Sequence, residues 1–277
     1  MTDVLYLPLN NVPMAPMLPL MITKGCYNTV IEVMRAMFQG FSDKTADFLW
    51  GLTLNNDRAW FQAHKDAFEA DLNQPFKALA AETLERMQAR HPDADYGLHV
   101  ARIYRDARRL YGRGPFKENL WFTIHRGDKL PGAPTYWFEL DGKSWSYGIG
   151  AWDSTAEHAA AWRAAIEADP ARLEAIIDAI AARGDYRLWG EVYRRPKGDV
   201  GEKLNPWYNR KHISVGWEHP FGGDLFSPAL PDIVAEGFEL LTPLYEMKLA
   251  LFQRVEAEQA ALRALSRSGD KAPKWDF

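Results

Sequence analysis

The chain has 277 residues, with 33 Lys and Arg against 37 Asp and Glu and a formal net charge of −4. A mildly acidic chain of this kind is not coated by nucleic acid, so any contact with a polyanion has to be local. Cys26 is the only cysteine, which excludes an intramolecular disulfide and a thiolate metal cluster and agrees with a reducing, cytoplasmic location.

The first 36 residues differ from the rest of the chain. The stretch LYLPLNNVPMAPMLPLMI is apolar, but four prolines interrupt it and no basic residue precedes it. A signal peptide needs a basic start, and a membrane helix needs about 20 apolar residues. We therefore expect residues 1–36 to be a disordered arm or an upstream translation and predict no membrane partner. One domain is then predicted over residues 37–266, followed by a frayed tail over 267–277.

Three helices are predicted at the start of this domain. Ser42 and Asp57 are good N-caps, and each precedes apolar residues at helical spacing. Pro75 fits the first turn of the third helix, which turns Phe76 and Leu79 inward.

Strands follow from about His99. The stretch NLWFTIH is rich in β-branched and aromatic residues. TYWFEL and SWSYGIG flank Asp141-Gly142, and an Asp-Gly step between apolar runs predicts a hairpin. These strands indicate a largely antiparallel sheet.

The second half of the chain returns to helices. Ser154 with Glu157 forms a capping box, so a helix is predicted to begin there, and Asp169-Pro170 begins another that ends at Gly184. Strand-like residues 186–193 and 212–217 come next, and then a helical stretch over 231–266 with a kink at Pro243. The fold class is therefore α+β: one domain with a mainly antiparallel sheet packed by helices.

Positive charge gathers in one place, which we call the basic segment, residues 102–117. It holds six Arg and Lys against a single acid, Asp106. If the segment is a strand, Arg102, Asp106 and Arg108 share one face and Arg105 lies on the other. Guanidinium groups bind phosphate and carboxylate in bidentate fashion, so a converging cluster indicates an anionic ligand. The alternative is a structural ion-pair network that holds the sheet to a helix.

Two blocks of the sequence resemble the family named domain of unknown function 2461. The first is carried by Phe38, Gly40, Phe41, Asn55, Asn56, Trp60, Phe61, Pro75 and Leu79, and the second by Arg102, Arg105, Asp106, Arg108, Pro115, Phe116 and Lys117. GIGAW and the later Trp162, Arg163 and Ile166 extend the resemblance over residues 37 to about 220. Residues 108–113 depart from the family pattern, since an expected Lys and Asp are absent. The resemblance implies no particular activity, because the biochemistry of that family is unassigned.

Other motifs are weak. Gly142-Lys143-Ser144 lacks the first glycine of a phosphate-binding loop, and GIGAWD has Asp153 where a dinucleotide fingerprint needs a small residue. The seven histidines show no His-x-x-x-His spacing, so we predict no metal site and no cofactor. Glu139, Asp141 and Asp153 lie near the glycine-rich strand, but the sequence selects no catalytic pair among them.

Asn55, Asn56 and Trp60 have two interpretations. Asn-Asn tolerates a left-handed turn and Trp60 can fill a helix junction, whereas amides at a helix start can also bind a ligand.

The leading hypothesis is that a small anionic or phosphorylated ligand binds to the basic segment, with or without catalysis. Its residues are Arg102, Arg105, Asp106, Arg108 and Lys117, together with Asn55, Asn56 and Trp60. The alternatives are a protein-interaction module with a structural Arg cluster and, less favoured by the net charge, local binding of single-stranded nucleic acid. The sequence leaves the ligand, the reaction and the oligomeric state open.

Overall fold

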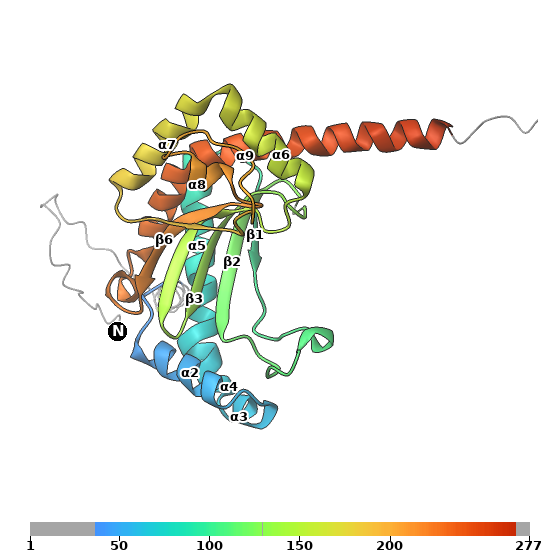
Figure 1. Ribbon diagram of the computed structural model, residues 1–277. Helices are drawn as coiled ribbons and strands as arrows, with labels where there is room; N and C mark the ends of the chain where they lie inside the picture. Colours follow the sequence, from blue (N-terminus) through green and yellow to red (C-terminus); the bar gives the residue numbers. More distant parts are fainter. Residues whose placement is uncertain (1–36, 129, 270–277) are drawn as a thin grey trace, which may run out of the picture.

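The computed structural model describes residues 37–128 and 130–269, so the predictions for residues 1–36 and for 270–277 lie outside the described residues. The described chain forms a six-stranded sheet in the order β1-β2-β3-β4-β6-β5, and every pair is antiparallel. The strands are β1 (Tyr96–Val100), β2 (Asn119–Arg126), β3 (Thr135–Asp141), β4 (Ser144–Gly150), β5 (Arg187–Trp189) and β6 (Ser214–Pro220). Together with the helices this sheet confirms the predicted α+β domain (Figure 1).

The helices lie before, between and after the strands. They are α2 (Asp43–Leu54), α3 (Arg58–Ala63), α4 (Lys65–Ala67), α5 (Gln74–Arg90), α6 (Ala156–Ala168), α7 (Pro170–Ala182), α8 (Asn205–Tyr208) and α9 (Leu230–Gly269), with a π-helical turn over Phe68–Asn73 and short 3-10 turns over Ala107–Arg109 and Gly223–Phe226. Helix α9 contains Pro243 and includes the first three residues of the stretch that we expected to be frayed. Its C-terminal part projects beyond the body of the molecule in Figure 1.

Local sequence signals account for several of these boundaries. The Asp57 carboxylate accepts a hydrogen bond from the Trp60 backbone and starts α3, and Asp169 does the same for the Arg172 backbone at the start of α7. Asp141 Oδ1 accepts hydrogen bonds from the backbone of Lys143 and Ser144, which closes the predicted β3–β4 hairpin.

The capping box predicted at Ser154 and Glu157 is wrong by one residue. Thr155 is the N-cap of α6, and His158 is the reciprocal partner three residues later. Ser154 instead donates its hydroxyl to the Ala151 carbonyl. The error arose because Ser and Thr stand next to each other and both can cap a helix, so local sequence does not choose between them.

One face of the sheet is covered by α5 and α9. Alternate strand residues such as Phe122, Phe138 and Trp145 point into this layer and are fully buried. Tyr136 stacks on Tyr245 of α9 at 4.3 Å between ring centroids, and Gly237 lets α9 approach the Tyr147 ring, since a Cβ there would lie 2.3 Å from it. The core therefore lies on this side, and the opposite face of the sheet over β2, β3 and β4 is only partly covered. Thr123 and Trp137 are each 5% exposed there, whereas Trp121 and Glu139 are more exposed.

The described part of the chain contains no helix that is both long and apolar enough to span a membrane.

Candidate ligand groove on the open face of the sheet

The face of the sheet opposite α5 and α9 carries the strand residues that alternate with the buried ones. On β2 these are Asn119, Trp121 and Thr123, and on β3 they include Trp137 and Glu139. Because side chains alternate along a strand, the same pattern that buries Phe122 and Phe138 turns this polar and tryptophan-rich set outward.

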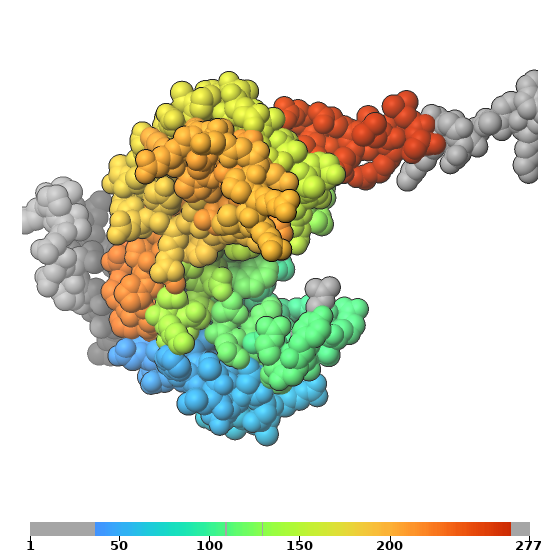
Figure 2. All heavy atoms as spheres, viewed as in Figure 1, coloured from blue at the N-terminus to red at the C-terminus, as the bar shows by residue number. Residues whose placement is uncertain are grey.

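A cavity of about 540 Å³ opens on this face. Trp121, Trp137 and Trp152 line it, together with residues 130–133 from the connection before β3 and Thr135 at the start of β3. A second hollow of about 230 Å³ shares Trp137, Glu139 and Trp152 with the first and continues over β4 to Trp189 and Glu218. We call the two together the open-face groove. Figure 2 shows the molecule hollowed between the basic segment and the lobe that contains α6 and α7.

The tryptophan rings are held in place by neighbouring groups. Trp137 donates Nε1–H to Ser214 Oγ at 3.1 Å, and that hydroxyl donates to the Ile149 carbonyl. The Trp137 ring meets Trp189 at 5.5 Å and Trp152 at 6.4 Å, both edge to face. Rings fixed in this way are a prepared surface for a flat ligand, because little side-chain entropy is lost on binding.

One polar atom in the groove lacks a partner. Thr123 is only 5% exposed, and its Oγ1 has no hydrogen bond among the described residues. A buried hydroxyl without a partner costs about 1–3 kcal/mol, so its presence needs an explanation. A ligand in the groove would satisfy it.

Carboxylates form the other side of the groove. Glu139, Asp141 and Asp153, the three acids noted from the sequence, all line it. Glu139 accepts a hydrogen bond from Asn119 Nδ2, and Glu218 pairs with Arg187. Carboxylates accept hydrogen bonds from hydroxyl and amino groups, so this side of the groove favours a ligand rich in such donors.

The basic segment leads from β1 to β2, and most of it is not the strand that we considered. Only Tyr104 pairs, in a single bridge with Phe116, and residues 107–109 form a 3-10 turn. Tyr111 and Gly112 both have positive φ, which folds the segment back on itself. Because these residues form turns and not a strand, the prediction that Arg102, Asp106 and Arg108 share one face does not apply.

Arg105 and Asn56 form one hydrogen-bonded network. Arg105 Nε donates to the Phe116 carbonyl at 2.6 Å, and its terminal nitrogen lies 3.4 Å from Glu118. Asn56 Nδ2 donates to that same carbonyl, and its Oδ1 accepts from the Phe116 backbone. Because Asn56 lies between α2 and α3, this network ties the basic segment to the helical layer.

Lys117 lies where the basic segment meets the groove. Its Nζ is 5.9 Å from the Trp121 ring centroid and donates to the Arg102 carbonyl at 2.6 Å. Burial, followed by the charges of Arg102 and Arg105, lowers the pKa of Lys117. Lys117 and the two arginines thus place positive charge beside Trp121, next to the residues that line the groove.

The other predicted residues are less central. Asp106 caps the 3-10 turn and pairs with exposed Arg108 at 2.9 Å. Asn55 donates its side chain to the Gly51 carbonyl, and Trp60 stacks on His64 at 4.1 Å. The structure therefore brings Arg102, Arg105, Lys117 and Asn56 together, and it leaves Asn55 and Trp60 outside this group.

Sequence reasoning missed the tryptophans of the groove. Trp121 and Trp137 stand at strand spacing among other aromatic residues, and aromatics in that pattern are more often buried in a core. One sequence signal does point to this face. Asn119, Trp121 and Thr123 alternate along β2, so two polar side chains lie on the same face as the Trp121 ring. Trp152 and Trp189 come from distant segments, so only the fold brings them to this face.

The fold and groove define a class of protein: one α+β domain whose antiparallel sheet is covered on one side and carries a ligand-sized groove on the other. The chain belongs to the family described as conserved hypothetical protein (DUF2461), whose sequence model matches residues 44–247. This confirms the resemblance seen in the two sequence blocks. No curated protein matches the sequence.

Proposed function

We propose that the protein binds a small ligand that combines a flat or hydroxyl-rich ring with an anionic group such as phosphate. The ring lies against Trp121 and Trp137 in the open-face groove, and the anion meets Lys117 and Arg102 at its end. Arg105 and Asn56 then position the basic segment. One observation carries this proposal: the groove of about 540 Å³ has tryptophan walls and a buried Thr123 hydroxyl that lacks a partner in the described chain.

The size and charge of the groove favour this class of ligand. Ligand pockets in proteins measure about 300–1,000 Å³ and combine apolar walls with a few polar groups. The carboxylates at Glu139 and Asp153 accept hydrogen bonds from hydroxyl groups, whereas the ammonium of Lys117 attracts an anion. A sugar phosphate or a nucleotide carries both kinds of group in one molecule.

Thr123→Val separates a binding role from a structural one. Valine has nearly the same shape but removes the unpartnered hydroxyl, so the variant without ligand should be as stable as the wild type or more stable, by up to about 1 kcal/mol. It should also lose part of the stabilisation that the ligand gives. If the Thr123 hydroxyl were structural, Thr123→Val would be less stable than the wild type.

The test is a thermal-shift panel of sugar phosphates, nucleotides and inorganic phosphate on the wild type, Thr123→Val and Lys117→Met. A ligand at 100 times its dissociation constant stabilises the fold by about 2.7 kcal/mol. We expect a shift that both variants reduce. Lys197→Met is the matched control, since Lys197 also lies over a ring, that of Tyr193 at 5.0 Å, and is not part of the groove. An equal shift in all four proteins, or no shift with any probe, would contradict the proposal.

A second candidate, binding of a single-stranded nucleic acid, is favoured by one observation. Tyr104 and Tyr111 of the basic segment are 56% and 81% exposed, and exposed rings beside cations are surfaces on which bases stack. Short oligonucleotides therefore belong in the same panel. Affinity that falls steeply with salt and is lost in Tyr111→Ser would favour this candidate over the small ligand.

A further inference from the structure

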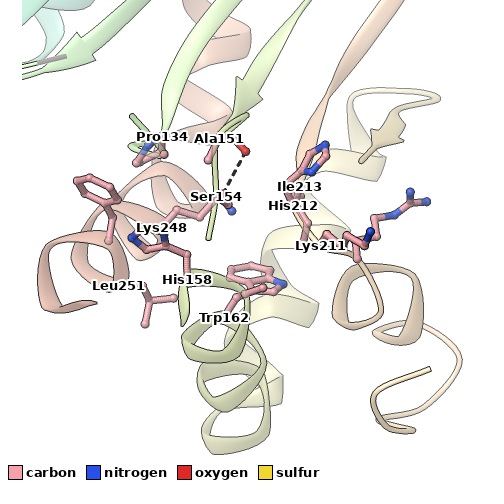
Figure 3. Close-up of a pocket in the computed structure, with 14 residues that line it drawn as sticks. Pro134, Ala151, Ser154, His158, Trp162, Lys211, His212, Ile213, Lys248 and Leu251 are labelled. Atoms are coloured by element: carbon pink, nitrogen blue, oxygen red, sulfur yellow. Dashed lines mark hydrogen bonds between the residues drawn. The ribbon is translucent and has the colours of Figure 1, made fainter. Parts of the chain in front are cut away.

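A small cavity lies beside the open-face groove and shares Gly132 with it. Its volume is about 30 Å³, and its walls come from α6, from α9 and from the segment before β6. Figure 3 shows Lys248 of α9 among the residues that line it, with Ser154, His158 and Trp162. A single water needs about 10–15 Å³ on this measure, so the cavity holds one very small molecule or a reactive end of a larger one.

Lys248 lies in this cavity without a counter-charge. Its Nζ is 4.8 Å from the centroid of the Trp162 ring, and that ring is fixed by a hydrogen bond from Nε1 to the Trp207 carbonyl. Among the described residues, no carboxylate pairs with the ammonium and no hydrogen bond to it is found. The residue is partly buried, and burial lowers the pKa of Lys248 to about 8. The Trp162 ring favours the ammonium and partly opposes this effect.

The other charged groups around the cavity are mostly basic. His158 hydrogen-bonds through Nδ1 to Thr155 and lies 3.5 Å through Nε2 from Glu256, and Asp153 lines the neighbouring groove. Arg210 donates to the carbonyls of Pro206 and Gly190, and Lys211 pairs with Glu191. His212 meets the Trp152 ring. In Figure 3, Lys211 and His212 lie across the view from Lys248. Burial alone lowers the pKa of Lys248, and it favours the neutral amine.

We propose that Lys248 is a nucleophilic amine that forms an imine with a small aldehyde or ketone. A neutral amine is the reactive form, and lysines activated by desolvation in an apolar pocket use this chemistry. The nitrogen lone pair attacks the carbonyl carbon, a C–N bond forms and the C=O double bond opens to a carbinolamine. One nitrogen proton passes to the oxygen in forming this carbinolamine, the hydroxyl then leaves as water with the second nitrogen proton, and a C=N bond remains. No oxidant or reductant is consumed, and this site does not rest on the proposed function of the groove.

The expected advantage over an ordinary lysine follows from the neutral fraction. With a pKa of about 8 in place of 10.5, the neutral fraction of Lys248 at pH 7 is about 300-fold larger. Enclosure slows access, so we expect a rate advantage over an exposed lysine that is smaller than this ratio of neutral fractions.

The experiment labels the full chain with a small amount of acetaldehyde in the presence of cyanoborohydride, which traps an imine as a stable ethylamine. Peptide mass mapping then compares Lys248 with Lys197, an exposed lysine whose ammonium also lies over an aromatic ring, that of Tyr193. We expect Lys248 to be labelled before Lys197 at pH 7, with a rate that rises with pH to a midpoint near 8. Labelling no faster than that of Lys197, or a midpoint near 10.5, would overturn the proposal.

Lys248→Arg gives a second measurement. Arginine keeps a cation over Trp162 but forms no imine, so the fast label should disappear while Lys197 is labelled as before. A fast label that persists in this variant would place the reactive amine elsewhere. The map of the wild-type protein is decisive by itself if the variant does not fold.

Discussion

Arg105→Met tests whether Arg105 braces the basic segment. The Arg105 side chain is 13% exposed and donates to the Phe116 carbonyl at 2.6 Å. Methionine keeps most of the apolar stem and removes the charge and the donors. The free energy of unfolding should therefore fall mainly through the loss of these hydrogen bonds.

The magnitude can be worked from the contacts. A hydrogen bond from a charged donor contributes about 1.5–3 kcal/mol. The pair with Glu118 adds little, about 0–1 kcal/mol, because that carboxylate is 44% exposed and the two atoms are 3.4 Å apart. The Phe116 carbonyl keeps the hydrogen bond from Asn56, which limits the loss. We expect a destabilisation of about 2 kcal/mol, or roughly 4–8 °C in Tm for a domain of this size.

Arg102→Met is the matched comparison. Arg102 is exposed, and among the described residues its backbone carbonyl accepts a hydrogen bond from Lys117 Nζ. Its replacement should change the free energy of unfolding by less than about 0.5 kcal/mol and yet weaken binding of an anion. Urea unfolding followed by circular dichroism measures both variants. Equal stabilities of the two variants would refute the bracing role of Arg105.

Two further predictions concern the rest of the fold. Gly40 has a φ of +98°, and a Cβ there would lie 2.2 Å from the Phe226 carbonyl oxygen. Gly112 has a φ of +78° but open surroundings, so Gly112→Ala should cost only backbone strain, roughly 1–2 kcal/mol, and Gly40→Ala should cost well over that. Thermal melts of both variants check this, and equal losses of stability would contradict it. Burial lowers the pKa of His219, so the unfolded chain takes up its proton first as pH falls below about 6.5, and stability should decline from that point. In His219→Phe this decline should be smaller, as urea unfolding at several pH values can show, and an unchanged slope would be the contrary result.

Much of the fold could be predicted from local sequence. The turn within the basic segment and the groove could not. The caps at Asp57 and Asp169 and the hairpin at Asp141 act within a few residues, so their chemistry is visible in the chain. The groove depends instead on segments far apart in sequence, because Trp189 comes to lie against Trp137 only when the sheet is built.

The basic segment shows the limit of charge patterns. Six like charges indicate an anion site, yet they do not reveal which of them is already paired. Arg105 lies in a network with Glu118 and Arg108 pairs with Asp106, whereas Lys117 reaches the tryptophan groove. The partners of each cation are set by the return of the chain at Tyr111 and Gly112, a conformation that alternation along the chain does not predict.

The most direct test of the groove uses the tryptophan side chains themselves. Indole N–H signals in an NMR titration with a sugar phosphate and a nucleotide report on Trp121 and Trp152 in the groove and on Trp50, which is exposed on α2 outside it. Signals are assigned through single Trp→Phe variants. Binding in the groove predicts that the Trp121 and Trp152 signals shift together with one saturation curve, that Trp50 does not, and that Lys117→Met weakens the curve. Shifts confined to Trp50, or no shift at either groove tryptophan with any probe, would contradict a ligand site on the open face.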